Sequence, residues 1–181
     1  MSKDHTTGLS LRLDPGVLAA LSAQAHAAGM EVQAYIQAVL RRHALESGQL
    51  AADERRRLLR NDRILQLAVA RAREVHAAGG FDEHFILTVM RRLIAEPDFR
   101  ALYEEAVGGD AFTPGLPEKS PLNMYLGWHI RHAVGAEPLL DSRGRTRRAT
   151  VRGEVLQSYM LLAPPDADAA GDAPPPRRVQ P

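Results

Sequence analysis

Residues 9–42 read LSLRLDPGVLAALSAQAHAAGMEVQAYIQAVLRR, and this stretch decides how the N-terminal part of the chain folds. It opens with an alternation in which Leu9, Leu11 and Leu13 are apolar and the two residues between them are polar. A period of two is typical of a strand that buries one face. We therefore expect a short strand at residues 9–13.

Two helices are predicted to follow this strand. The first begins at Asp14, a favourable N-cap, and at Pro15, whose fixed φ suits the first helical position. Gly29 is expected to end this helix, and Ser47-Gly48 to close the second one. The apolar stripes of the two helices consist of Val17, Leu18, Leu21, Ala25 and Ala28 in the first and Val32, Ile36, Val39 and Leu40 in the second.

One strand and two short helices are too little for an independent domain. An unpaired strand exposes N–H and C=O groups that need a ladder partner, and two such helices bury too little apolar surface alone. Pairing with a second copy meets both needs, so the sequence predicts a homodimer. The expected dimer core consists of Leu9, Leu11, Leu13, Leu21, Ile36, Val39 and Leu40.

This order of strand, Pro-opened helix, Gly turn and second helix resembles the ribbon-helix-helix family of DNA-binding proteins, the Arc/MetJ/CopG-like class, over residues 8–46. The resemblance implies that two strands pair into an antiparallel ribbon that lies in the DNA major groove. In that family the outward strand positions contact bases, and they are here Gly8, Ser10 and Arg12. Arginine at such a position suits a bidentate contact with guanine. The family also holds a DNA phosphate at the N-terminus of the second helix, a position occupied here by Met30, Glu31 and Val32.

A second interpretation of the same segment is that the dimer serves only as a scaffold. Gly8 has no side chain to contact a base, and Glu31 places a carboxylate beside the expected phosphate site. Moreover, a fold alone does not fix a function. In this alternative the ribbon-helix-helix unit only dimerises, and the helical domain that follows binds a protein partner.

Composition divides the chain into three segments. We expect residues 1–48 to be the dimerisation and DNA-binding module and residues 49–163 to be a mostly helical domain ending in a short β-hairpin. Residues 164–181 hold six of the twelve prolines, which predicts a disordered tail. The fold class is therefore mainly α.

Charge is nearly balanced, with 23 Lys and Arg against 22 Asp and Glu, which excludes a globally basic nucleic-acid coat protein. The positive excess is local, because residues 111–163 hold seven basic and four acidic side chains. Any contact with DNA would therefore depend on a few arginines.

Four more helices are predicted between residues 53 and 134, and their starts are expected at Asp53, Asp82, Pro97 and Ser120-Pro121. A loop with three glycines and two prolines spans residues 108–120. Arginines crowd the first of these helices behind Asp53 and Glu54, so we expect an exposed, ion-paired helix more than a DNA-binding one. Tyr125 and Trp128 fall beside the last apolar stripe, where they are either half-buried or open to a partner.

The sequence PLLDSRGRTRRATV, residues 138–151, predicts a basic hairpin with its turn at Asp141–Arg145. Residues 155–162 are expected to add a further strand. A helix followed by a basic hairpin resembles, in arrangement only, the helix and wing of winged-helix DNA-binding proteins. The side chains that would then contact DNA phosphates are Arg143, Arg145, Arg147 and Arg148. Alternatively the charges only keep the hairpin solvated and prevent edge pairing.

Several kinds of chemistry have no support in the sequence. Without cysteine there is no disulfide, thiolate metal site or cysteine nucleophile. Phosphate-binding glycine motifs and the usual hydrolase and zinc-protease motifs are missing too. We therefore expect no enzymatic activity, no catalytic residue and no cofactor. His129 and His132 are one helical turn apart, but no third ligand lies near them in sequence, so no metal site is expected.

These observations favour a homodimeric, sequence-specific DNA-binding protein of a bacterial regulator, antitoxin or plasmid-maintenance type. Its partners would be double-stranded DNA and a second copy, and its C-terminal domain could bind an effector or another protein. No apolar run is long enough to cross a membrane, and we expect a cytoplasmic location.

Overall fold

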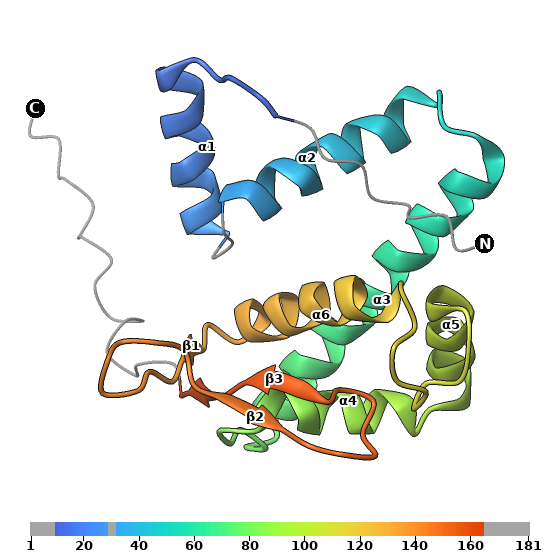
Figure 1. The fold of residues 1–181 in the computed structure, drawn as a ribbon, viewed down its shortest axis with the longest axis vertical. Coiled ribbons are helices and arrows are strands. Elements are labelled where there is room, and N and C mark those ends of the chain that lie inside the picture. Colours follow the sequence, from blue (N-terminus) through green and yellow to red (C-terminus); the bar gives the residue numbers. More distant parts are fainter. Residues whose placement is uncertain (1–9, 29–31, 165–181) are drawn as a thin grey trace, which may run out of the picture.

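The computed structural model describes residues 10–28 and 32–164, and this part of the chain is mainly helical, as the sequence predicts (Figure 1). Its helices are α1 (Pro15–Ala27), α2 (Val32–Ser47), α3 (Ala52–Ala77), α4 (Phe85–Ile94), α5 (Pro97–Val107) and α6 (Lys119–Ala133). Its short strands are β1 (Glu137–Pro138), β2 (Arg148–Thr150), β3 (Ser158–Met160) and β4 (Leu162–Ala163). No helix in this part of the chain is long and apolar enough to span a membrane.

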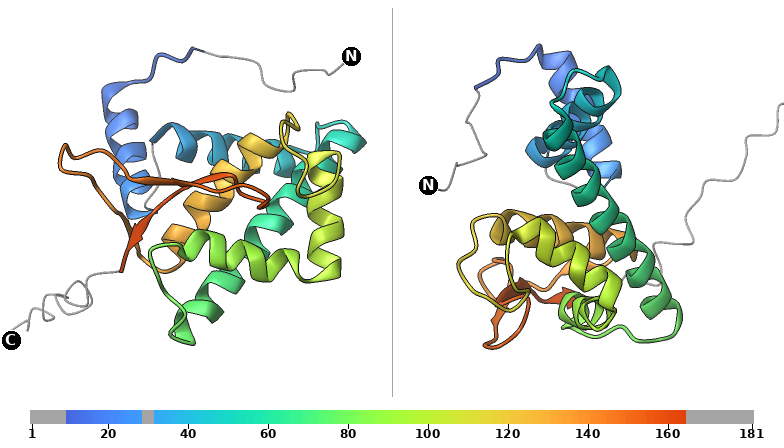
Figure 2. Two further views of the ribbon diagram at one scale, coloured as in Figure 1. Left: turned by 60° about the horizontal axis from the view of Figure 1, so that its bottom comes forward. Right: turned by 90° about the vertical axis from the view of Figure 1, so that its right-hand side faces the viewer.

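The helices form two groups that α3 joins. Helices α1 and α2 pack on each other beside the first turns of α3, and we call them the helix pair. The rest of α3 runs into a body made of α4, α5, α6 and the strands (Figure 2). Residues 48–51, which connect α2 to α3, form a short linker. The helix pair therefore has to lie close to the first turns of α3.

The hydrophobic core lies in the body. Helix α3 packs against α4, α5 and α6 through a stripe that includes Ile64, Ala68 and Ala72, which are fully buried. The small alanines let neighbouring helices approach closely. The hydroxyl of the buried Tyr103 donates to Asn123 Oδ1 at 2.7 Å, so its polar end is satisfied inside the core.

Several helix boundaries follow the predicted capping residues. Asp14 is the N-cap of α1, and its carboxylate accepts from the backbone N–H of Gly16 at 2.8 Å. Pro97 occupies the first position of α5. Gly48 after α2 and Gly135 after α6 both have positive φ, which glycine adopts without strain.

Three predicted helix starts are wrong by one to three residues. Helix α3 has Ala51 as its N-cap, and Asp53 lies in its first turn. A carboxylate there still interacts favourably with the helix dipole and so stabilises the helix. Asp82 belongs to a turn that precedes α4, because its carbonyl accepts from Phe85 N–H. Helix α6 begins at Lys119, two residues before Pro121, since the first turn of a helix tolerates a residue without N–H.

The predicted hairpin is confirmed, with its turn at Asp141–Arg145. Asp141 N–H donates to the carbonyl of Arg145 at 2.8 Å, and Leu140 pairs with Thr146. The expected further strand at residues 155–162 is confirmed in part: residues 155–157 are not in a strand, and two short strands follow, with β3 pairing antiparallel with β2 and β4 pairing antiparallel with β1.

Three extended segments therefore meet at one point. Leu139 N–H donates to Leu161 O (2.9 Å), Leu161 N–H to Arg147 O (3.0 Å) and Arg147 N–H to Leu139 O (2.7 Å). Each segment pairs with the other two there, so none of them leaves an open edge at this level.

The predicted N-terminal strand is not observed in the single chain. Residues Ser10, Leu11, Arg12 and Leu13 form no regular secondary structure and are exposed. The physical reason is that no strand among the described residues pairs with them to form a ladder. Leu9, the predicted turn at Gly29 and residues 165–181 of the predicted tail lie outside the described residues.

Candidate nucleic-acid interface

The helix pair has almost no core of its own. Among the described side chains of α1 and α2, Ala25 alone is buried. Six of the ten exposed large apolar residues in the described part of the chain lie in this pair or in the segment just before α1, and they are Leu11, Leu13, Val17, Leu18, Val39 and Leu40, at 37 to 53% exposure. The apolar surface of the protein is thus concentrated on one small unit.

The predicted dimer-core residues divide into two groups. Leu21 and Ile36 are half-buried within the helix pair. Leu11, Leu13, Val39 and Leu40 are exposed, so the single chain leaves them without an apolar environment. A helix hairpin that exposes this much apolar surface lacks the packing that usually stabilises short helices.

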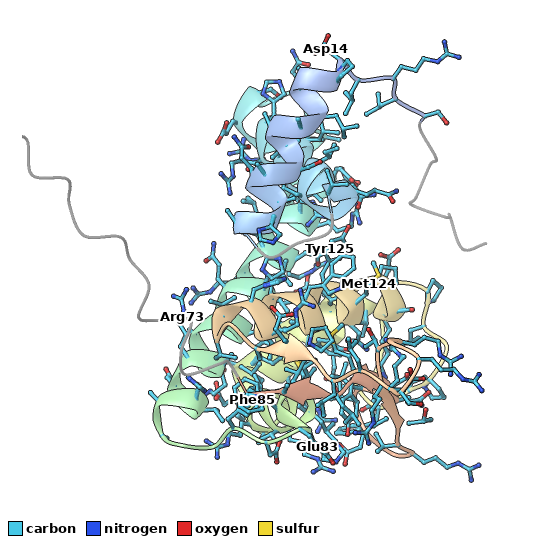
Figure 3. All side chains as sticks on the ribbon, turned by 90° about the vertical axis from the view of Figure 1, so that its left-hand side faces the viewer. Asp14, Arg73, Glu83, Phe85, Met124 and Tyr125 are labelled. Carbon is cyan, nitrogen blue, oxygen red and sulfur yellow. The ribbon has the colours of Figure 1, made fainter. Side chains whose placement is uncertain are left out.

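Of the predicted base-contacting residues, Ser10 and Arg12 are described, and Gly8 lies outside the described residues. Both side chains are exposed just before the N-cap Asp14 of α1, which Figure 3 labels. The guanidinium of Arg12 has no hydrogen-bond or ion-pair partner among the described residues, so it is available to a ligand.

Of the predicted phosphate-binding residues at the start of α2, Val32 is described as the first residue of the helix. Met30 and Glu31 lie outside the described residues. The described first turn of α2 contains no acidic side chain, and the only nearby carboxylate in the sequence is that of Glu31 just before the helix.

The four arginines of the hairpin are all exposed, but they differ in their partners. Arg145 binds Asp141 Oδ2 through Nε (3.0 Å) and Nη2 (2.9 Å), and Arg148 Nε donates to Ser158 Oγ at 3.2 Å. The backbone N–H groups of Arg145 and Arg143 lower the pKa of Asp141, which therefore holds the turn as a carboxylate. The side chains of Arg143 and Arg147 have no partner in the described part of the chain.

The arginines of α3 confirm the predicted ion-paired helix. Arg57 pairs with Glu54 one turn earlier, as the order of acidic and basic residues predicts. Two pairs that are distant in sequence tie α3 to α5 and its N-cap, namely Arg60 with Glu105 and Arg71 with Glu96. Three of the seven arginines of α3 are thus ion-paired within the chain, and the other four, Arg55, Arg56, Arg63 and Arg73, are exposed.

The helix pair contacts the body through Tyr125 of α6, one of the two aromatic residues for which the sequence left two roles open. Figure 3 shows Tyr125 at the junction between the two groups of helices. Its hydroxyl donates to Gln37 Oε1, and the guanidinium of Arg41 lies over its ring. Trp128 packs edge-to-face on the same ring, with centroids 5.7 Å apart. Both aromatic residues are half-buried.

The two histidines of α6 have no metal-binding geometry. In the described ranges, no group of three His, Cys, Asp or Glu side chains is placed to hold a metal ion. Burial and the neighbouring Arg131 lower the pKa of His132 to about 4. Burial, followed by the charge of Arg41, also lowers the pKa of His129. Both rings are therefore neutral near pH 7.

A cavity of about 520 Å³, which sequence reasoning missed, lies in the body between α6 and the segment that includes β3. Helix α4, the loop before α6 and β2 complete its walls. Because its lining comes from five places in the sequence, no local motif could have revealed it. Its position is separate from the exposed side chains of the helix pair.

No protein-family model matches the chain, and neither a curated protein nor a solved structure matches it. The function has to be inferred from the residues themselves.

Proposed function

We propose that this protein is a homodimeric, sequence-specific DNA-binding protein of the ribbon-helix-helix type. In this proposal residues 9–13 of two copies pair into an antiparallel ribbon, and α1 and α2 of both copies bury their apolar faces together. The ribbon enters the major groove, and the protein acts as a transcriptional regulator of the repressor, antitoxin or plasmid-maintenance kind.

The observation that carries the proposal is the exposure of apolar side chains on the helix pair and on the segment just before it. Leu11 is 53% exposed and Leu40 is 50% exposed, whereas the core of the body is fully buried. Burying apolar surface stabilises by roughly 25 cal/mol per Å², so a second copy that covers these side chains gives a large gain. The same contact would give residues 10–13 the ladder partner that they lack.

The position of Arg12 supports a role in DNA recognition. In a strand, side chains alternate between the two faces, so Ser10 and Arg12 lie opposite the leucines that would form the dimer core. Two-fold symmetry presents each of them twice, at positions suited to two halves of one DNA site. Because the net charge is only +1, most of the specific binding energy would come from these few contacts.

Selection from a random pool of DNA duplexes tests this function. The full-length chain should enrich a two-fold symmetric sequence, and Arg12→Ala should weaken binding to it by about 1–3 kcal/mol. Arg42→Ala, an exposed arginine of α2, is the matched control and should bind nearly as well as wild type. If no sequence is enriched at low salt, the chain does not recognise DNA specifically.

A separate measurement concerns the hairpin arginines. Each phosphate contact adds about 0.9 to the slope of log K against log salt, and each arginine is present twice in a dimer. If Arg143 and Arg147 contact phosphates, replacing both with Ala makes this slope shallower without changing which sequence is preferred. A dimer that binds no DNA with or without these arginines would favour the scaffold interpretation, with a protein partner for the helical body.

A further inference from the structure

The cavity beside α6 has the size of a small-molecule site. Its volume is about 520 Å³, within the range of roughly 300–1,000 Å³ that is usual for ligand pockets. The N-terminal half of α6 forms one wall, and residues 155–160 form the facing one. The two walls belong to the same packed body, so the cavity is preformed.

The charged residues that line the cavity are both cationic. They are Lys119 at the start of α6 and Arg148 in β2, and no carboxylate lines the cavity. The remaining polar lining consists of uncharged side chains that donate or accept hydrogen bonds, such as Ser120 and Asn123. Charge of one sign in a partly enclosed space attracts a ligand of the opposite sign.

Lys119 is a buried ammonium without a carboxylate partner in the described part of the chain. It is 6% exposed, and its Nζ donates to the carbonyls of Ala111 (2.6 Å) and Thr113 (2.9 Å). An ammonium carries three donors, so one remains after these two bonds. Burial lowers the pKa of Lys119, although the charge of Asp110, which forms no direct ion pair with Lys119, acts on the ammonium and opposes this effect. A buried charge that is only partly compensated is unfavourable, and an anion in the adjoining cavity would offset the remaining cost.

Arg148 supplies a second cation at the opposite wall. Its Nε donates to Ser158 Oγ at 3.2 Å, which orients the guanidinium, and its terminal nitrogens have no partner among the described residues. A guanidinium with two free terminal nitrogens is suited to a carboxylate, which it binds with two parallel hydrogen bonds.

The rest of the lining is apolar and aromatic. It includes Trp128, Tyr159, Ile86 and the flexible side chains of Met124 and Met160. Such a surface suits the hydrocarbon or aromatic part of a ligand.

Gly127 keeps the space open. It lies in the interior of α6 and is buried, and a Cβ there would meet only Ile86 Cδ1, at 3.9 Å. Packing of the neighbouring helix therefore does not require glycine, although glycine in a helix interior is unfavourable by about 1 kcal/mol relative to alanine. Gly127 lines the cavity, so a large side chain at this position would occupy part of that space.

From these observations we infer that the cavity binds a small organic acid, with its carboxylate held by Arg148 in the positive field to which Lys119 contributes and with an apolar body against Trp128. Two cations select the anionic group, and the apolar floor selects a hydrocarbon or aromatic body over a sugar or a free phosphate. This inference does not depend on DNA binding or on dimerisation.

Titration of the full-length protein with benzoate, 4-phenylbutyrate and octanoate tests the inference, with the neutral amide of each acid as the comparison. Trp128 is the single tryptophan of the chain, so its emission reports occupancy, and calorimetry gives the stoichiometry. We expect at least one acid to bind once per chain and about tenfold more tightly than its amide, which corresponds to 1.4 kcal/mol. Equal binding of every acid and its amide, or no binding of any acid, would overturn the inference.

Variants locate the site. Arg148→Gln should weaken binding of the acid by about tenfold and leave binding of the amide unchanged. Arg147 does not line the cavity, so the matched control Arg147→Gln should change the affinity for neither compound. Gly127→Leu fills the cavity and should abolish binding of both. Because Arg148 is exposed, its replacement should leave the fold intact, which circular dichroism checks. If Arg147→Gln weakens the acid as much as Arg148→Gln does, the acid binds to the hairpin surface and the inference is wrong.

Discussion

The guanidinium carbon of Arg41 in α2 lies 5.0 Å from the centroid of the Tyr125 ring in α6. This contact and the hydrogen bond from Tyr125 to Gln37 join the helix pair to the body. A cation over an aromatic ring contributes about 0.5–1 kcal/mol at an exposed site, so the junction is weak compared with the core. The helix pair is therefore held by this junction, by the packing of α2 beside α3 and by the covalent link to α3.

Replacing Tyr125 with Leu tests the junction, since it removes both the ring face and the hydroxyl. We expect the linker at residues 48–51 to be cleaved about tenfold faster in limited proteolysis, because losing about 1.4 kcal/mol increases the open population tenfold. Met124→Leu, a change of the exposed neighbour on α6, should leave the rate unchanged. An unchanged rate for Tyr125→Leu would show that the contact does not hold the pair in place.

Leu40→Arg should turn the proposed dimer into a monomer, because it puts a charge into the apolar face that a second copy would cover. Leu40 is 50% exposed in the single chain, so the charge is tolerated there and the monomer stays folded. Sedimentation velocity of wild type and variant measures the difference.

The matched control for that experiment is Leu140→Arg in the hairpin, where the leucine is 56% exposed. It should leave the dimer intact. If wild type sediments as a monomer at every concentration, the dimer does not form; if both variants dissociate it, the interface lies elsewhere.

His132 should make the protein less stable in mild acid. Arg131 Nη2 can only donate, so its contact of 2.9 Å with His132 Nε2 requires a neutral ring. The pKa of His132 is lowered to about 4, below the value of about 6.5 for an unfolded chain. Between these values the unfolded state binds more protons, so stability is full above about pH 6.5 and falls as pH drops toward 4.

Urea unfolding at a series of pH values checks this expectation. His132→Gln should make the free energy of unfolding depend less steeply on pH between about 6.5 and 4. His43 is exposed on α2, so His43→Gln should leave this dependence unchanged. Carboxylates such as Glu104, whose pKa is lowered first by Arg100, add to the acid slope in both proteins. The comparison of variants isolates the histidine, and identical slopes for wild type and His132→Gln would refute its role.

Gly127→Ala should stabilise the protein by about 0.5–1 kcal/mol, because alanine is the better helix former and its methyl meets Ile86 at an ordinary contact distance. Gly80→Ala is the opposite case, because its Cβ would lie 3.0 Å from the carbonyl oxygen of Val75. This substitution should destabilise the protein. Chemical denaturation of both variants measures the two changes. A loss of stability in Gly127→Ala would mean that the space beside α6 is already filled.

The sequence was informative wherever a structural signal is local. Asp14 and Pro15 predicted the start of α1 because capping and a fixed φ act within one turn. The hairpin turn at Asp141–Arg145 was predictable for the same reason. The start of α6 was misplaced because Pro121 is tolerated anywhere in a first turn, so it does not fix a single register.

Features that join distant residues were not predictable. Arg60 forms an ion pair with Glu105, which lies 45 residues later in the sequence. The backbone hydrogen bonds between Leu139, Arg147 and Leu161 form only where three extended segments meet. The cavity is likewise formed only when α6 and β3 pack together. Periodicity identifies which face of an element is apolar, but it does not identify the neighbour of that face.

The stoichiometry of the complex with DNA tests the central claim most directly. Sedimentation equilibrium of the full-length chain, mixed at low salt with a short duplex selected by it, gives the number of chains bound. A two-fold symmetric ribbon predicts two chains per duplex for wild type, and the same stoichiometry with binding weakened by about 1–3 kcal/mol for Arg12→Ala. One chain per duplex, or no complex for wild type, would contradict the account.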